Sequence, residues 1–242
     1  MSKSLTLLNL FSRHLNGYGD EGNLLVLRKR AEWRGFTVRI IDFELGDNPA
    51  LFEDADLIFG GDGHQSSQMA LWPEVERIAE SLLQRIESGV PALAIGASYQ
   101  LFGEYLETLE GERLKGAGIF SAHTVLEEQR KTGNIVVLSS NFGEILGYEN
   151  HSGKTTLHKG QEPLAQVISG FGNNGEDATE GARSGKALGT YLHGPLLPKN
   201  PQVADFLIAA ALEQRFGEPV ELALLPSPWL EQARGVAKSR PR

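Results

Sequence analysis

Three short segments of the sequence carry residues that could act together on a carbonyl compound. They are Gly60–Gly63 (Gly-Gly-Asp-Gly), Gly96–Ser98 (Gly-Ala-Ser) and Tyr191–Pro195 (Tyr-Leu-His-Gly-Pro). A glycine-rich turn at a strand end can offer backbone N–H groups to an oxyanion. A histidine such as His193 can take the proton of a nucleophile. Each segment alone is more often an ordinary turn or a structural or surface histidine, so the prediction depends on their meeting in the fold.

The segment Val90–Gly103 is the centre of this prediction. Its apolar first part, Ala92–Ile95, has strand length, and its second part, Ser98–Phe102, begins like a helix. A buried strand that turns sharply into a helix is the geometry of a nucleophile elbow. The apex residue, Gly96, has no side chain, so an ordinary tight turn is the competing interpretation. A hydrolase that uses Ser98 is a further alternative, but Ser98 lies two residues past the apex and we expect it to be structural.

The elements that must position these segments alternate between strand and helix patterns. Short apolar runs predict strands, and apolar residues at helical spacing predict helices between them. The order strand–helix–strand–strand–helix–strand–helix implies a mostly parallel sheet covered on both faces, with ligands beyond the carboxyl ends of the strands. The predicted strands are Ser4–Leu10, Phe36–Phe43, Ala55–Phe59 and Ala92–Ile95, and the predicted helices cover 24–34, 72–88 and 98–102.

Helix boundaries follow from capping residues. Asp20 or Asn23 could cap the first helix, and Asn200 could cap the closing helix, 200–216, with Pro201 at its first helical position. Pro73 is expected near the start of the helix 72–88, where its missing N–H does no harm. The stripe expected to be buried in that helix is Val75, Ile78, Leu82 and Ile86.

The middle of the chain has few helix signals. Strand-like pieces within 120–150 and a Gly- and Asn-rich stretch at 153–175 predict antiparallel strands and loops added to one edge of the sheet. Ala187–His193 is expected to be the last strand. Without a linker or repeat, the sequence predicts one domain over 1–217, with 218–242 as a tail of the same unit.

Composition limits the functions to consider. Of 242 residues, 40% are hydrophobic and 22% charged, with a net charge of −8, which fits a globular protein and argues against a nucleic-acid partner. The chain has no cysteine, so it forms no disulfide and no thiolate metal site. The histidines at positions 14, 64, 123 and 158 do not have the spacing of metal ligands, so no metal is expected. No apolar run reaches membrane-spanning length and the first residues do not resemble a signal peptide, so a cytoplasmic location without membrane insertion is expected.

The chain resembles class I glutamine amidotransferases of the cobyric-acid-synthase-like branch, over nearly its whole length. The resemblance implies a three-layer, flavodoxin-like α/β fold, with a mostly parallel sheet and antiparallel edge strands. The matching segments, in family order, are 18–23, 32–35, 60–65, 94–100, 147–153, 172–175 and 189–200. The last three of these, 147–153, 172–175 and 189–200, are similar to the glutaminase subunits of lipid II isoglutaminyl synthases.

Such a resemblance implies a function in peptidoglycan biosynthesis. The subunit would hydrolyse glutamine and supply ammonia to a MurT-like Mur ligase, which amidates the D-glutamate α-carboxylate of lipid II to D-isoglutamine. The glycine-rich loops are not followed by Gly-Lys-Ser/Thr, so no cofactor is expected on this chain, and ATP and Mg²⁺ would belong to the partner ligase. A cobyrinate amidotransferase is a weaker alternative, because such enzymes usually carry their synthetase domain on the same chain.

By the same resemblance, the nucleophilic cysteine of the family belongs at Gly96, and His193 matches the general base. As written, the chain cannot form a glutamyl thioester. Either Gly96 is an engineered replacement, which the intact surrounding motifs favour, or it is a natural loss that leaves a non-catalytic partner-binding subunit. Many relatives carry a glutamate two residues after the histidine; here that residue is Pro195. We therefore expect another segment, or the partner ligase, to orient His193.

Further residues are assigned to substrate binding. Backbone N–H groups of Gly61 and Ala97 would hold the oxyanion. Gln65 and Gln100 could contact glutamine, or they could be solvated residues at helix starts. Arg130 matches a family arginine that would bind the substrate α-carboxylate, with a solvated surface charge as a nearly equal alternative. Matching residues for which the sequence gives no role are His151, Asn173 and Asn174.

Overall fold

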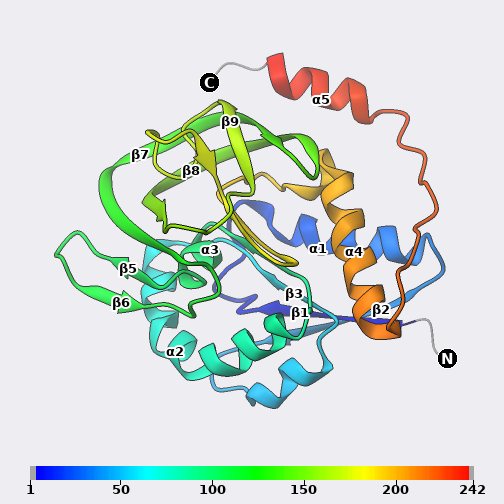
Figure 1. Cartoon of the computed structure of the whole chain (residues 1–242), viewed down its shortest axis with the longest axis horizontal. Coiled ribbons are helices and arrows are strands. Elements are labelled where there is room, and N and C mark those ends of the chain that lie inside the picture. Colours follow the sequence, from blue (N-terminus) through cyan, green and yellow to red (C-terminus); the bar gives the residue numbers. More distant parts are fainter. Residues whose placement is uncertain (1–3, 240–242) are drawn as a thin grey trace.

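A computed structural model describes residues 4–239, and Figure 1 shows the chain built around a parallel sheet. Among these residues the sheet has the strand order β11-β12-β4-β3-β1-β2, in which only β11 runs antiparallel to its neighbour. This confirms the predicted mostly parallel sheet with an antiparallel edge. Its strands are β1 (Ser4–Leu10), β2 (Thr37–Phe43), β3 (Leu57–Gly60), β4 (Ala92–Ile95), β11 (Ala182–Ser184) and β12 (Ala187–Thr190).

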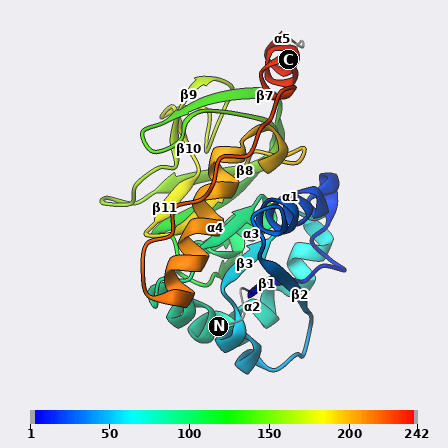
Figure 2. The ribbon, with the colours of Figure 1, turned by 90° about the vertical axis from the view of Figure 1, so that its right-hand side faces the viewer.

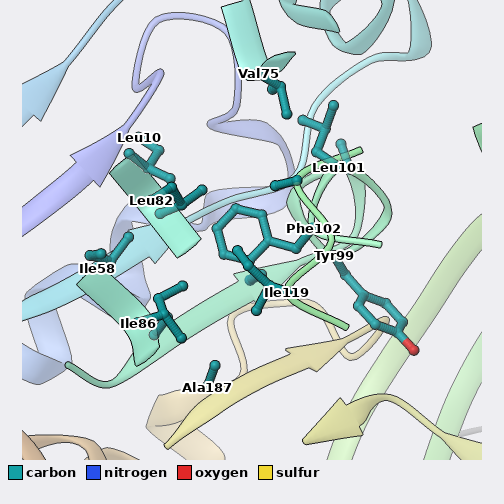
Figure 3. Packing of buried hydrophobic residues seen from close by; sticks show 14 of the residues in the cluster. Leu10, Ile58, Val75, Leu82, Ile86, Tyr99, Leu101, Phe102, Ile119 and Ala187 are labelled. Atoms are coloured by element: carbon teal, nitrogen blue, oxygen red, sulfur yellow. The ribbon is translucent and has the colours of Figure 1, made fainter. Parts of the chain in front are cut away.

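Helices cover both faces of this sheet, and each face has its own apolar core. Residues of α2 (Gln65–Glu87) and α3 (Ala97–Leu101) pack against Leu8 and Ile58 on one face. Residues of α1 (Glu21–Glu32) and α4 (Pro201–Phe216) pack against Leu7 on the other. Figure 3 shows the first core, with Val75, Leu82 and Ile86 of the predicted helix stripe pointing at the sheet. Three short 3-10 helices complete the connections, namely η1 (Gly17–Gly19), η2 (Pro49–Asp54) and η3 (Leu197–Lys199).

The second helix begins earlier than the sequence predicts. It starts at Gln65 rather than at Trp72, so Pro73 lies inside the helix and the prediction that it lies near the start is wrong. A proline there removes one helical hydrogen bond. The buried side chains of Leu71 and Trp72 anchor the extra turns, and Trp72 Nε1 donates to the Lys115 carbonyl oxygen at 2.6 Å. The tertiary packing of Leu71 and Trp72 therefore outweighs the local preference of proline for the first turn of a helix.

The strands of the middle of the chain form a separate, mostly antiparallel sheet, and the expectation that they extend the edge of the parallel sheet holds only for β11. The order within the described residues is β10-β9-β7-β5-β6, and β8 pairs with β7. Figure 2 shows these green and yellow strands above the parallel sheet. The cause is the length of the β7–β8 hairpin, which pairs with itself over most of its residues. The bounds are β5 (Tyr105–Glu107), β6 (Arg113–Lys115), β7 (Ala122–Ser139), β8 (Gly143–Leu157), β9 (Ala165–Ser169) and β10 (Thr179–Glu180).

The C-terminal tail carries a helix that the sequence analysis missed. Residues 218–227 form neither helix nor strand, and α5 (Leu230–Ser239) follows beside β7 and β8, in red in Figure 1. Arg234 fixes this helix by donating to the Lys199 carbonyl oxygen at 2.8 Å and to Glu144 Oε1 at 2.9 Å. Among residues 4–239, no helix combines the length and the apolar character needed to cross a membrane.

Two predicted caps use their side chains elsewhere. Asp20 and Asn200 occupy the capping positions of α1 and α4, but neither side chain accepts a backbone N–H from the first turn of its helix. Asp20 Oδ2 instead accepts from the backbone N–H of Asp62 at 2.7 Å. Asn200 Oδ1 accepts from the backbone N–H of Leu146 at 2.9 Å. The predicted cap positions of Asp20 and Asn200, with Pro201 at the start of α4, are therefore confirmed, while the two side chains connect distant segments.

Gly189 in β12 tests how tightly α3 packs on the sheet. A Cβ at this position would lie 2.3 Å from Tyr99 Cδ2 and 2.7 Å from Phe120 Cε2. We expect Gly189→Ala to lower the free energy of unfolding by about 1–3 kcal/mol, because overpacking forces side chains off their rotamers. Urea denaturation measures the change. Gly235→Ala, in α5 with no atom within 4 Å, is the matched control. Equal stabilities of the two variants would contradict this packing.

Candidate active site

The three segments singled out from the sequence meet at one edge of the parallel sheet. β3, β4 and β12 are neighbours in the sheet, and each segment follows the carboxyl end of one of them. The register pairs Gly60 with Ala94 and Thr190 with Ile95. The backbone N–H of Gly96 also donates to the Thr190 carbonyl oxygen at 2.9 Å. The geometric expectation on which the sequence analysis depends is therefore met.

Gly96 has the strained backbone of an elbow. Its φ of 54° and ψ of −109° lie in a region that residues with side chains rarely adopt. A Cβ at this position would lie 2.3 Å from Asp62 Cγ and 2.8 Å from Asp62 Cβ. Both distances are too short for non-bonded atoms. The Asp62 side chain thus fills the volume into which a nucleophilic side chain at position 96 would project.

Asp62 also occupies the position predicted for the oxyanion. Its Oδ1 accepts from the backbone N–H of Ala97 at 2.6 Å, which is the N–H group assigned to the oxyanion in the sequence analysis. Burial raises the pKa of Asp62 to about 6, against the opposing effect of this hydrogen bond. Only the glycines of this loop are assigned a role from the sequence. Asp62 could have been noticed there, because an acidic residue is unexpected inside a loop that should bind a negative charge.

Gly61 and Ser98 hold the loop against the elbow. Ser98 is 1% exposed, and its Oγ donates to the Gly61 carbonyl oxygen at 2.6 Å. A Cβ on Gly61 would lie 2.4 Å from the Leu15 carbonyl oxygen, so only glycine fits there. The Ser98 hydroxyl therefore points into the protein below the loop, which gives no support to a hydrolase with Ser98 as its nucleophile.

His193 lies directly behind Asp62. Its Nε2 is 3.4 Å from Asp62 Oδ2, and its backbone N–H donates to the Tyr148 carbonyl oxygen at 2.7 Å. Burial lowers the pKa of His193 to about 4, so the ring is neutral at physiological pH. Neither ring nitrogen makes a hydrogen bond to any residue within 4–239. No hydrogen bond from the described part of the chain therefore orients the ring, and Pro195 lies against Gly22.

A cavity of about 240 Å³ opens beside Gly96, between the Asp62 loop and the β7–β8 hairpin. Gln65, Gln100 and Arg130 line it together with Gly96 and Ala97. The structure therefore brings the predicted substrate-binding residues to one cavity. His193 and Gly61 are not among the lining residues, because the Asp62 side chain separates His193 from the cavity.

Gln100 and Arg130, two of the predicted substrate contacts, differ in where they lie and in how their side chains are already hydrogen-bonded. Gln100 Oε1 accepts from Gln68 Nε2 at 2.6 Å, and Gln100 Nε2 donates to the Tyr191 hydroxyl at 3.0 Å, so both ends of this amide are engaged inside the protein. Arg130 lies at the rim. Its Nε and Nη2 donate to the side-chain and backbone oxygens of Asn150 at 2.9 Å and 2.8 Å. These bonds fix the guanidinium against the hairpin, unlike a freely solvated charge.

His151 is a lining residue to which the sequence gave no role. It is 5% exposed, and its ring stacks on Tyr191 with centroids 3.7 Å apart. Its Nδ1 lies 2.8 Å from the Gly153 carbonyl oxygen, which requires Nδ1 to carry the proton. Its Nε2 has no hydrogen-bond partner among residues 4–239. Burial lowers the pKa of His151 to about 3, so Nε2 presents a lone pair to the cavity.

The floor of the site rests on a buried carboxyl group. Glu180 Oε1 accepts from the backbone N–H of Tyr191 at 2.8 Å and from Thr190 Oγ1 at 2.9 Å. Full burial raises the pKa of Glu180 to about 8. Asn173, another residue without an assigned role, is structural, because its Nδ2 donates to the Gly181 carbonyl oxygen at 2.9 Å and its Oδ1 accepts from the Gly181 N–H at 2.9 Å. Asn174 Nδ2 donates to the Thr155 carbonyl oxygen of β8 at 3.1 Å.

Comparison with known proteins agrees with this geometry. The family described as the CobB/CobQ-like glutamine amidotransferase domain matches residues 8–201. The chain belongs to this family. A CobB/CobQ-like amidotransferase is what the sequence resemblance predicted, and that prediction is confirmed.

Two curated relatives of this CobB/CobQ-like amidotransferase carry the same description, the GatD subunit of a glutamine-hydrolyzing lipid II isoglutaminyl synthase. The one from Staphylococcus aureus is 39% identical over 90% of this chain and 88% of its own length. The one from Streptococcus pneumoniae is 33% identical over 90% of this chain and 84% of its own length. Among solved structures, one glutamine amidotransferase superposes with a TM-score of 0.60 at 14% identity, covering 84% of this chain and 98% of the other, which supports the fold.

Proposed function

We propose that this chain is the amidotransferase-type subunit of a two-subunit ligase that amidates lipid II, and that it binds its partner without hydrolysing glutamine. The similarity to the two GatD subunits supports the first part of the proposal. The observation that carries the second part is the Asp62 carboxylate, which accepts from the Ala97 N–H at 2.6 Å and leaves no volume for a side chain at position 96.

The chemistry that this arrangement blocks can be stated step by step. In a relative with cysteine at position 96, the thiolate would attack the carboxamide carbon of glutamine, and His193 would take the thiol proton. Backbone N–H groups of Gly61 and Ala97 would hold the oxyanion, ammonia would leave, and water would hydrolyse the thioester to glutamate. In this chain the thiol is missing and the Ala97 N–H is already bonded to a carboxylate.

The same contact bears on the origin of Gly96. An engineered replacement in an otherwise active enzyme would leave an empty volume above the glycine. Here the Asp62 side chain packs against the glycine closely enough to exclude a Cβ. Although the intact motifs of the sequence favour an engineered replacement, this packing supports a natural loss in which the loop and the elbow have changed together. We therefore favour the partner-binding subunit.

The partner supplies the remaining chemistry in this proposal. A MurT-like Mur ligase would hold ATP and Mg²⁺ and activate the D-glutamate α-carboxylate, and ammonia from solution would complete D-isoglutamine. This chain would need no cofactor of its own. The missing partner for His193 Nδ1 agrees with an orienting group on the ligase, since none lies within residues 4–239. The complex would act on the cytoplasmic face, where ATP is available.

The nitrogen source of the complex tests this function. The chain is purified with its MurT-like partner, and lipid II amidation is followed by mass spectrometry with either ammonium chloride or glutamine. We expect amidation with ammonium, and a rate at least ~100-fold lower with glutamine, because general acid–base and nucleophilic steps contribute factors of that size or more. Glutamate release at a rate matching amidation would overturn the loss of glutaminase activity. Failure to form a complex would overturn the subunit assignment.

A further inference from the structure

The inner end of the cavity beside Gly96 presents two hydrogen-bond acceptors. One is the Asp62 carboxylate, whose Oδ1 takes the Ala97 N–H and whose Oδ2, 3.4 Å from His193 Nε2, has a lone pair left for a further donor. The other is His151 Nε2, which is buried and has no partner among the described residues. A carbonyl or carboxylate oxygen placed between them would be repelled. A group made of N–H donors fits both.

Three polar side chains that line the cavity are already bonded within the protein. Gln68 Nε2 donates to Gln100 Oε1, Gln100 Nε2 donates to the Tyr191 hydroxyl, and that hydroxyl lies 2.6 Å from Thr155 Oγ1. These side chains form one connected network, which rigidifies the floor. The Asp62 carboxylate and His151 Nε2, which can still accept a hydrogen bond, therefore decide which end of a ligand can enter the cavity.

The rim has the opposite character. Arg130 lines the opening, and its two bonds to Asn150 hold the guanidinium in place. A fixed guanidinium favours a carboxylate. The cavity volume of about 240 Å³ leaves room for one free amino acid.

We propose that this cavity binds an α-amino acid with a cationic terminal nitrogen, held by Asp62 and His151 at the inner end and by Arg130 at its carboxylate. L-Ornithine is the probe, because it has the five-carbon chain of glutamine with a CH2–NH3+ end in place of the carboxamide. It lacks the carbonyl oxygen that would compete with Asp62 for the Ala97 N–H. The inference rests on the Asp62 geometry that also supports the proposed function, and it adds a ligand class to that site.

Calorimetric titration of the purified chain at pH 7.5 tests the proposal with L-ornithine, L-glutamine and L-glutamate. We expect ornithine to bind at least ~10-fold more tightly than glutamine, and glutamate to bind most weakly, since a hydrogen bond between charged groups is stronger than one between neutral groups. Asp62→Asn is expected to lower the ornithine affinity at least ~10-fold. His151→Phe keeps a ring to stack on Tyr191, removes the acceptor and is expected to weaken ornithine binding as well.

Controls separate the possible failures. Asp54→Asn removes an exposed carboxylate outside the cavity and should leave all three affinities unchanged. Arg130→Gln, at the rim, should weaken ornithine and glutamate alike and serves as the second variant if Asp62→Asn does not fold. The proposal would be overturned if glutamine bound more tightly than ornithine, or if none of the three amino acids bound. Ammonium-dependent amidation by the complex would still stand in that case, because it does not require the cavity to be occupied.

Discussion

Gly96→Cys alone is expected to leave the chain without glutaminase activity, whereas the double variant Gly96→Cys/Asp62→Gly is expected to release glutamate from glutamine. The reason is steric and electrostatic. A Cβ at position 96 would lie 2.3 Å from Asp62 Cγ, and the Asp62 carboxylate would still hold the Ala97 N–H. Removing the carboxylate and its Cβ frees the thiol volume, frees that N–H and opens the path from position 96 to His193.

The measurement is glutamate release by each variant in complex with the MurT-like partner. We expect the double variant to exceed the single variant by at least ~100-fold, the lower range for general-base catalysis. Adding His193→Ala to the double variant should return the rate to background, which shows that the regained activity uses the expected base. Comparable activity of the single and double variants would mean that Asp62 does not block the site, and that Gly96 is a simple replacement in an otherwise intact glutaminase.

The second large effect is a loss of stability with rising pH that depends on Glu180. Its pKa is raised from 4.5 in the unfolded chain to about 8 in the folded protein by burial. The folded state therefore binds the proton more tightly, and the stabilisation is complete below pH 4.5 and is lost as pH rises toward 8. Each pKa unit corresponds to about 1.4 kcal/mol, so the total change amounts to several kcal/mol.

Glu180→Gln should flatten this dependence. The glutamine oxygen can still accept from the Tyr191 N–H and from Thr190 Oγ1, but no proton is released. Urea denaturation between pH 5 and pH 9 compares the two proteins. Asp20 and Asp62 also have raised pKa values, of about 7 and about 6, and they act in the same direction in both proteins. Glu218→Gln, an exposed substitution, should keep the wild-type slope. Equal slopes for Glu180→Gln and wild type would refute the assignment.

The sequence predicted the parts of the fold that depend on local patterns. The β4–Gly96–α3 elbow could be read from a four-residue apolar strand followed by small residues. The buried stripe of α2 followed from helical spacing. The start of α2 could not be predicted, because the packing of Trp72 and Leu71 around Pro73 is tertiary. The separate antiparallel sheet also escaped prediction, since strand patterns do not say which sheet a strand joins.

The sequence predicted which segments meet at the site, but it did not predict which side chains fill the centre of the site. Gly96, His193 and the Gly60–Gly63 loop meet as expected because neighbouring parallel strands end at the same edge. The side chain that fills the centre, Asp62, could not be found from residue types, because an aspartate in a glycine loop looks like a turn residue. His151 needed the β7–β8 hairpin to be in place before its unpaired nitrogen could be seen. The roles assigned to Gly61, Gln65 and Arg130 stay predictions.

Covalent labelling of position 96 tests the central claim without the partner. Gly96→Cys and Gly96→Cys/Asp62→Gly are incubated with the diazoketone analogue of glutamine, 6-diazo-5-oxo-L-norleucine, and intact masses are recorded. The Asp62 side chain fills the space that the thiol at position 96 and the carbonyl group of the reagent would need. We therefore predict that the double variant gains one label at residue 96 and that the single variant gains none. Equal labelling of the two variants would contradict the account.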